Sequence, residues 1–456
     1  MKTALLFLTL LAAGLGLGSP GFAQEAATLA TVSEAVAVAD SADQAAPTVD
    51  KGDVAWMLVS TILVLLMALP GLALFYGGML RAKNALSVMT QVFAISSLIG
   101  VLWVVYGYSL AFTAGNPVIG SFDKLFLSGV TVDSLAATFT DGVALPELLF
   151  MLFQLTFAGL TAALIVGGLA ERVKFSALLV FSALWFTLAY LPMVHMVWVE
   201  GGLMFDKGEL DFAGGTVVHI NAGVAALVGA LVIGRRLGFG REHLAPHNLT
   251  LTLIGGALLW FGWFGFNAGS SLEANGIAVL AAVNTMLASM AGALAWMAME
   301  WIVRGKPSLL GVVTGAIGGL VAITPAAGLA GPMGALVLGA LGSLAALWAI
   351  TALKARFGYD ETLDVFGVHG VAGIVGAIGT GIVVSPALGG VGLDGYSMGA
   401  QVLTQMTGVG LVIVWSGLVS FVLFKLIDLV MGLRVSEEQE REGLDTSTHG
   451  EQAYKL

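Results

Sequence analysis

The sequence predicts an all-α integral membrane protein with eleven transmembrane helices, and three observations lead to this fold class. Of 456 residues, 58% are hydrophobic and 11% are charged, whereas soluble domains carry roughly 25% charged residues. Apolar stretches of about 20 residues, the length that crosses a bilayer as a helix, recur along the chain. The 62 glycines allow membrane helices to approach closely. The alternative, a large soluble helical bundle, would leave this apolar surface in water.

The N-terminus has the pattern of a secretion signal followed by a flexible lead. An apolar run over residues 4–17 follows Lys2 and precedes the small-residue pattern Gly21-Phe22-Ala23. We therefore predict a cleaved signal peptide over residues 1–23. Residues 24–53 are rich in Ala, Asp, Glu and Ser, which predicts a flexible periplasmic segment.

Residues 54–431 form the predicted membrane domain. Each apolar stretch in it is long enough to cross the bilayer once, allowing for tilt. The stretches cover residues 54–76, 86–112, 145–170, 175–199, 214–234, 249–268, 277–303, 309–326, 331–353, 367–384 and 401–431.

Lysine and arginine alternate between the two sides of these spans. The loops after odd-numbered spans carry most of the positive charge, which marks the cytoplasmic side. This pattern places the N-terminus outside and the charged tail, residues 432–456, in the cytoplasm. The positive residues in question are Arg81, Lys83, Arg172, Lys174, Arg235, Arg236, Arg241, Arg304, Lys306, Lys354 and Arg356.

Composition also excludes several functions. The chain has no cysteine, so disulfides, thiolate metal sites and cysteine nucleophiles are ruled out. The net charge is -10 and no basic face exists that would hold nucleic acid.

Two spans repeat one motif. The pattern V-H-x-x-A-G surrounds His219 in span five and His369 in span ten. An odd offset of five spans reverses the direction of the second copy. Spans one to five and six to ten therefore predict an inverted repeat around a central pore, with both histidines near the midplane.

The paired histidines have three interpretations. An isolated histidine in a membrane most often ties helices together by a hydrogen bond. Two histidines at matching repeat positions favour a proton relay instead, because imidazole titrates near neutrality. A membrane enzyme that binds haem or a metal through His219 and His369 is the alternative of a different class, although further clustered ligands are lacking.

The motifs in their order resemble the signatures of the bacterial ammonium transporter (Amt) family. The resemblance runs from about Val54 into the tail. It is carried by Asp211-Phe-Ala-Gly-Gly-Thr-Val-Val-His219, Gly262-Trp-Phe-Gly-Phe-Asn-Ala-Gly-Ser270, Asp364-Val-Phe-Gly-Val-His369-Gly, Phe75-Tyr76-Gly77-Gly78, Leu169-Ala-Glu-Arg172, His195-Met-Val-Trp198 and Arg304-Gly-Lys-Pro-Ser-Leu-Leu310.

The resemblance implies an aromatic pore. Trp198 and Ser270, with Phe157 as a wall, match the family's external recruitment site for ammonium. Phe157 and Phe266, with Phe153 one turn earlier, match its gate. Without the resemblance, Trp198 at a span end would be interpreted as an interfacial anchor, and the phenylalanines as ordinary packing.

Two carboxylates precede the histidines. Asp211 begins span five, where it can cap helix N–H groups and favour a nearby cation. Asp364 lies ahead of His369 and is interpreted in the same way, as a structural residue.

The resemblance implies an ammonium transporter or channel in the bacterial inner membrane, not an enzyme, without a cofactor. Ammonium would lose its proton, cross as ammonia past the histidines and be reprotonated inside, with proton co-conduction. Methylammonium would serve as an analogue. The family also implies a homotrimer and control of the tail by a PII-type signal protein. The alternatives are an ammonium sensor with little conduction and a Rhesus-like carrier of another small neutral gas.

Overall fold

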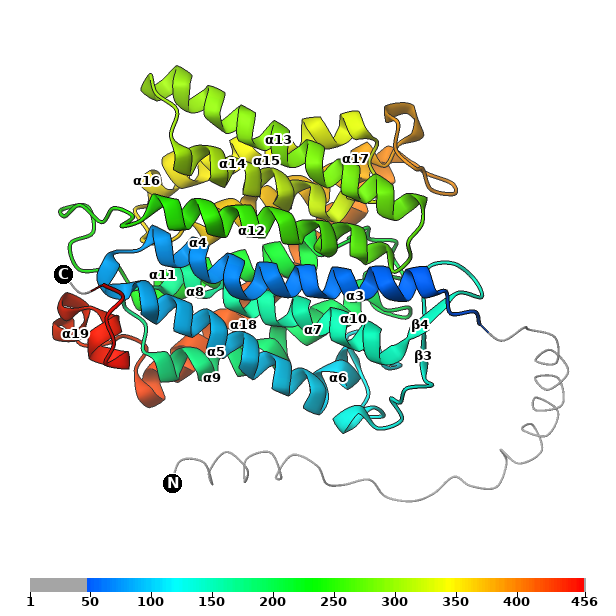
Figure 1. Ribbon diagram of the computed structural model, residues 1–456, viewed down its shortest axis with the longest axis horizontal. Helices are drawn as coiled ribbons and strands as arrows, with labels where there is room; N and C mark the ends of the chain where they lie inside the picture. Colours follow the sequence, from blue (N-terminus) through cyan, green and yellow to red (C-terminus); the bar gives the residue numbers. More distant parts are fainter. Residues whose placement is uncertain (1–46, 455–456) are drawn as a thin grey trace, which may run out of the picture. The chain divides into compact units, whose positions relative to one another are not determined.

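The computed structural model describes residues 47–454. The predicted signal peptide and residues 24–46 lie outside the described residues. Within residues 47–454, eleven helices are long and apolar enough to cross a membrane, as predicted. Figure 1 shows α16 and α19 at one end of these helices and β3 and β4 at the other.

The first five spans contain several short changes of helix type. Span one begins at Lys51, earlier than predicted, because the Asp50 side chain caps it by accepting from Gly52 N. The elements are α3 (Lys51–Leu66), η1 (Met67–Gly71) and α4 (Leu72–Met79); η2 (Ala82–Asn84), α5 (Ala85–Leu102), η3 (Trp103–Gly107) and α6 (Tyr108–Phe112); α7 (Glu147–Leu164) and α8 (Val166–Leu169); α9 (Phe175–Trp185), η5 (Phe186–Tyr190) and α10 (Leu191–Trp198); and η6 (Gly215–Ile220) with α11 (Asn221–Ile233).

The remaining six spans follow the same plan. Asn275 and Ser308 cap two of them by accepting backbone N–H groups. The elements are α12 (Leu249–Ala268) and η7 (Gly269–Ser271); α13 (Gly276–Arg304); α14 (Leu309–Ile323) and η8 (Thr324–Ala326); α15 (Pro332–Trp348), η9 (Ala349–Leu353) and α16 (Lys354–Phe357); η10 (Phe366–Val371) and α17 (Ala372–Val383); and α18 (Met398–Met431).

Short elements lie at both ends of the membrane helices. Two antiparallel strand pairs lie between spans two and three. These elements are β1 (Gly115–Asn116), β2 (Ile119–Gly120), η4 (Leu125–Leu127), β3 (Leu135–Ala137) and β4 (Ala144–Pro146), followed later by η11 (Pro386–Leu388), α19 (Glu437–Glu442) and η12 (Asp445–His449).

Spans five and ten cross with local two-fold symmetry. Gly223 lies four residues after His219, and a Cβ there would be 2.6 Å from Gly370 N. Gly373 lies four residues after His369, and its Cβ would be 3.0 Å from an Ile220 side-chain carbon. These reciprocal contacts are those of the predicted inverted repeat, and glycine permits the close crossing.

Spans one and six pack against each other as tightly as spans five and ten do. A Cβ on Gly255 would lie 2.1 Å from Phe75 N and 2.6 Å from Phe75 Cα. We expect Gly255→Ala to destabilise the protein by at least about 2 kcal/mol, because backbone atoms cannot move aside as a flexible side chain can. The apparent melting temperature in detergent, followed by size-exclusion chromatography, measures this effect.

Gly410→Ala is the matched control. Gly410 lies in α18 and its Cβ would meet nothing within 4 Å. Alanine should stabilise this helix by about 0.5–1 kcal/mol. Equal melting temperatures for the two variants would contradict the packing argument.

A polar network closes the end that carries the predicted cytoplasmic loops. Glu171 binds Arg81 at 2.9 Å and Arg236 at 3.1 Å, and Arg236 also binds Asp360 at 2.8 Å. The tail docks on the same end, where the Asp445 carboxylate accepts from the backbone N–H groups at the start of α5. We call this the basic end of the protein.

Candidate functional site

An outer cavity of about 600 Å³ opens at the end opposite the basic end. Trp198 and Ser270, the predicted recruitment residues, both line it. Phe157 and Asp211 line the same cavity. The fold therefore brings together residues from α7, α10, the loop after α10, and η7.

The polar groups of this cavity are oriented by the backbone. Ser270 Oγ donates to the Phe266 carbonyl at 2.8 Å, so its proton is occupied and its lone pairs remain available to accept. Trp198 Nε1 donates to the Asp211 carbonyl at 2.8 Å, which fixes the indole. An indole face attracts a cation, and a hydroxyl oxygen accepts an N–H bond. The pair suits a small cation that carries N–H groups.

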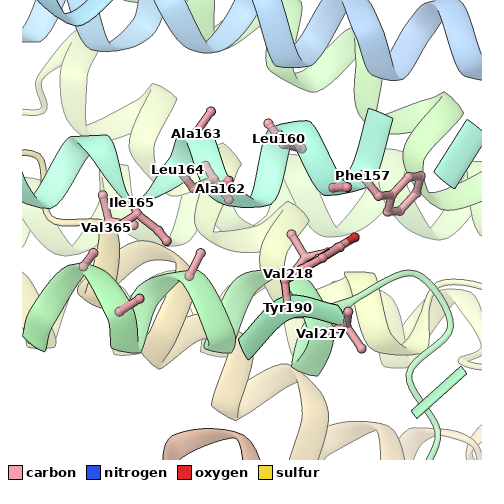
Figure 2. Close-up of a cluster of buried hydrophobic side chains, with 14 of the residues drawn as sticks. Phe157, Leu160, Ala162, Ala163, Leu164, Ile165, Tyr190, Val217, Val218 and Val365 are labelled. Carbon is pink, nitrogen blue, oxygen red and sulfur yellow. The ribbon is translucent and has the colours of Figure 1, made fainter. Parts of the chain in front are cut away.

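Two stacked phenyl rings lie inward of the outer cavity, which Phe157 lines. Phe157 and Phe266 lie with ring centroids 4.2 Å apart and planes at 17°. Both rings are buried. Phe153 contacts Phe157 edge-on at 4.9 Å and does not line the outer cavity, so it supports the pair from behind. Figure 2 shows Phe157 at one end of a buried row of α7 side chains that includes Leu160 and Leu164.

The aromatic row continues to the histidines. The Phe266 ring lies 5.8 Å from the His219 ring, which also stacks on Trp263 at 5.3 Å. A gap of about 10 Å³ lies next to both histidines, a space that holds about one water-sized molecule. Apart from the histidines, its lining is apolar and consists of Met67, Leu72, Phe75, Leu160, Leu164, Leu259 and Trp263.

His219 and His369 contact each other directly. Their Nδ1 atoms are 3.2 Å apart, and their ring centroids are 5.2 Å apart. One Nδ1 must donate and the other accept, so the neutral pair shares one proton in this contact. Both residues belong to π-helical segments, η6 and η10, a helix type that is frequent at functional sites.

An inner cavity of about 400 Å³ lies at the basic end and is lined by His369. Lys354 and Asp364 also line it and form an ion pair with 2.5 Å between Nζ and Oδ1. His369 thus lies between the apolar gap and a cavity that contains charged side chains.

The two spans that carry the histidines begin with the same capping device. Asp211 Oδ2 accepts from Thr216 N and Val217 N at 3.0 Å. Burial raises the pKa of the Asp211 carboxyl to about 6, and its backbone hydrogen bonds oppose that rise. The corresponding acceptor before span ten is Glu361, whose carboxylate accepts from Phe366 N at 2.9 Å.

Asp364 therefore does not cap span ten as Asp211 caps span five. It binds Lys354 and has a left-handed backbone, with φ of 58°. Its counterpart before His219 is Gly214, which also has positive φ. Burial and the Asp364 charge raise the pKa of the Glu361 carboxyl to about 8.

The sequence alone predicts no role for Glu361, Trp263 or Glu209. A spacing signal existed for Glu361, because it precedes His369 by eight residues, as Asp211 precedes His219. Trp263 was part of a matched motif, but its position against His219 depends on how α12 packs. Glu209 lines the outer cavity, and no pattern in the sequence separates it from an exposed loop carboxylate.

Two cavities on opposite sides of a narrow apolar gap, inside eleven membrane helices, define a multi-pass transporter or channel. The chain matches the model of the Ammonium Transporter Family over residues 55–454. It is 46% identical over 406 residues to the ammonium transporter of Bacillus subtilis (strain 168), with 89% of this chain and 98% of that protein covered. The chain belongs to the Ammonium Transporter Family, as the resemblance predicted.

Solved structures agree with this assignment. Candida albicans Mep2 matches with a TM-score of 0.78 and 32% sequence identity, covering 86% of this chain and 87% of that chain. A protein described as a sensor Amt protein matches with a TM-score of 0.80 and 26% identity, covering 87% of this chain and 98% of that one.

Proposed function

We propose that this protein transports ammonium by deprotonating it at the outer cavity and passing ammonia along the histidine pair. The observation that carries the proposal is the unbroken row of rings that leads from Trp198 at the outer cavity to His369 at the inner cavity. Ammonium is held against the Trp198 indole by its charge. It donates an N–H···O hydrogen bond to Ser270 Oγ.

The apolar passage that runs from Phe157 and Phe266 to the histidine pair provides selectivity. It offers potassium no oxygen atoms to replace its hydration shell, so potassium does not pass while the imidazoles fill the passage. Ammonium has a second route, because it can release a proton and continue as a neutral molecule. Ammonia fits the small gap beside the histidines and is reprotonated in the inner cavity. The histidine pair conducts the released proton, which makes net transport electrogenic.

Liposomes that contain the purified protein test this proposal. Labelled methylammonium uptake should saturate, and ammonium but not potassium should evoke a current. Uptake of ammonium without any current would contradict the proton conduction alone. Absence of uptake by the wild type would contradict transport and favour the second candidate, an ammonium sensor, which the likeness to the sensor Amt protein supports.

Ser270→Ala tests the recruitment site. Because a hydrogen bond to a charged group contributes about 1.5–3 kcal/mol, half-saturation for methylammonium should require at least about tenfold more substrate. The maximal uptake rate should change little, since the gate and histidines are intact. The measurement is uptake against methylammonium concentration.

Ser271→Ala is the matched control. Ser271 lines the same cavity but is more deeply buried, with 2% of its surface exposed against 9% for Ser270, so its Oγ is less accessible to a cation. Its removal should leave half-saturation unchanged. Equal shifts in the two variants would show that Ser270 has no special role in recruitment.

The metal-binding alternative has less support. Between residues 47 and 454, no group of three His, Asp or Glu side chains is placed to hold a metal. The two Nδ1 atoms are 3.2 Å apart and form a hydrogen bond with each other. A haem or metal absorption band in the purified protein would support metal binding by the histidines instead.

We further propose an inner-membrane orientation with the N-terminus outside, a trimeric assembly, and a regulatory tail that meets a PII-type protein. The basic end supports the orientation, because positive loops remain in the cytoplasm. The chain lacks cysteine, so single introduced cysteines at Thr48 and Glu451 report it. Labelling of both from one side would contradict the topology. Native mass spectrometry and pull-down with a PII protein test assembly and regulation.

A further inference from the structure

Glu209 places a second carboxyl group at the outer cavity, beside Asp211. The residue lines the cavity but is only 7% exposed. Its Oε1 accepts from Thr216 Oγ1 at 2.9 Å. Among the described residues, Oε2 has no hydrogen-bond partner. A buried oxygen of this kind is costly as an unpaired charge and less costly once protonated.

The surrounding helix is shaped to hold this carboxyl group. A Cβ on Gly408 of α18 would lie 2.2 Å from Glu209 Cδ and both carboxyl oxygens, so the carboxyl group occupies the space that glycine leaves and a larger residue would displace it. Gln405, one turn earlier in α18, fixes the adjoining loop by binding both Leu210 N and Leu210 O at 2.8 Å. The position of Glu209 is therefore built by α18 and η6 together.

Asp211 is the charged neighbour of Glu209. It comes from the same loop, whereas η6 presents Thr216 and α18 presents Gly408 and Gln405, which do not titrate. Burial and the Asp211 charge raise the pKa of the Glu209 carboxyl to about 8, and the Thr216 hydrogen bond opposes that rise. A carboxyl group of this kind gains and loses a proton close to neutral pH, where proton transfer by a side chain is efficient.

The two carboxylates differ in the donors that stabilise their charge. Asp211 Oδ2 accepts from two backbone N–H groups at the start of span five, so protonation of Asp211 would weaken this cap, although its Oδ1, like Glu209 Oε2, has no hydrogen-bond partner among the described residues. Glu209 accepts only from the Thr216 hydroxyl and caps no helix. A proton on Oε2 removes one of two negative charges that lie side by side, and it leaves the cap intact.

We propose that Glu209, rather than Asp211, accepts the proton that ammonium releases at the outer cavity. This inference rests on the transport function proposed above. An N–H bond of ammonium breaks with its electron pair left on nitrogen, and an O–H bond forms at Oε2. Ammonia and a neutral carboxylic acid result. The carboxylate returns when the proton moves on toward the histidine pair.

Transport by Glu209→Gln against pH tests the inference. Glutamine keeps the size of the side chain and can accept from Thr216, but it takes up no proton. At constant ammonium-ion concentration, the wild-type current should rise between about pH 7 and pH 9, as the carboxylate forms. The variant should lose this rise and transport about 100-fold less at the upper pH, the scale of a lost general base.

Two further variants separate proton transfer from structural support. Thr216→Val removes the hydrogen bond that lowers the pKa of Glu209, so the midpoint of the pH profile should move to higher pH. Glu200→Gln is the matched control, because Glu200 lines the same cavity but is exposed. It should keep the wild-type profile.

Each outcome is decisive. A wild-type pH profile in Glu209→Gln would overturn the inference while leaving ammonium transport intact. A folded Glu209→Gln that is inactive at every pH, together with an unmoved midpoint in Thr216→Val, would also overturn it, because it would assign Glu209 to structure alone. Failure of the wild type to transport would instead reject the proposed function.

Discussion

Replacement of both His219 and His369 by alanine is expected to abolish the preference for ammonium over potassium. The two imidazoles fill the space between the apolar gap and the inner cavity and hold one proton between them. Their removal opens a path in which water and hydrated ions replace the rings. Exclusion of a charge from an apolar passage contributes at least about 3 kcal/mol, so selectivity should fall about 100-fold.

Currents evoked by ammonium and by potassium in the same liposomes measure this ratio. His247→Ala is the control, because His247 binds the Leu80 carbonyl and the Tyr454 hydroxyl at the basic end, away from the pore. It should keep the wild-type ratio. A double histidine variant that remains as selective as the wild type would reject the proton relay and return the histidines to a role in tying helices together.

The sequence predicts the membrane architecture well because hydropathy and loop charge depend on composition more than on packing. The eleven spans needed only runs of apolar residues, and the inverted repeat needed only the shared motif around His219 and His369. In lipid every backbone polar group needs an internal hydrogen-bond partner, which a helix supplies within one segment, and this leaves few alternative structures.

Other features depend on backbone geometry that spacing does not encode. Asp364 was paired with Asp211, yet its left-handed backbone and its bond to Lys354 leave the capping role to Glu361. Both histidines lie in π-helical segments, η6 and η10, and no residue type predicts that helix form. The burial of Glu209 depends on Gly408, about 200 residues later, so no local pattern could reveal it.

The largest effect on stability is expected at Arg172, whose side chain is fully buried at the basic end. Its Nε donates to the Gly234 carbonyl at 2.8 Å, and its terminal nitrogens donate to Thr362 Oγ1 at 2.6 Å and the Asp360 carbonyl at 2.5 Å. Burial lowers the pKa of Arg172 to about 10, so the group is still charged at neutral pH. One side chain thus joins the end of α11 to the loop that precedes η10.

Arg172→Met keeps most of the length of the side chain but removes every donor. The carbonyls that lose their donor are buried, and the Asp360 carboxylate loses a nearby positive charge. We therefore expect the free energy of unfolding to fall by about 3–5 kcal/mol. Unfolding by sodium dodecyl sulfate in mixed micelles measures it. Arg172→Lys should recover only part of the loss, because a single ammonium cannot reach all of these acceptors at once.

Arg304→Met is the matched control for the loss of a guanidinium. Arg304 pairs with Glu300 at 3.2 Å, but its side chain is 59% exposed, and such pairs contribute at most about 1 kcal/mol. If both methionine variants unfold at the same detergent fraction, the buried hydrogen bonds of Arg172 are not what fixes the loop before η10. If only Arg172→Met is unstable and it also transports poorly, the position of His369 depends on a side chain that never meets the substrate.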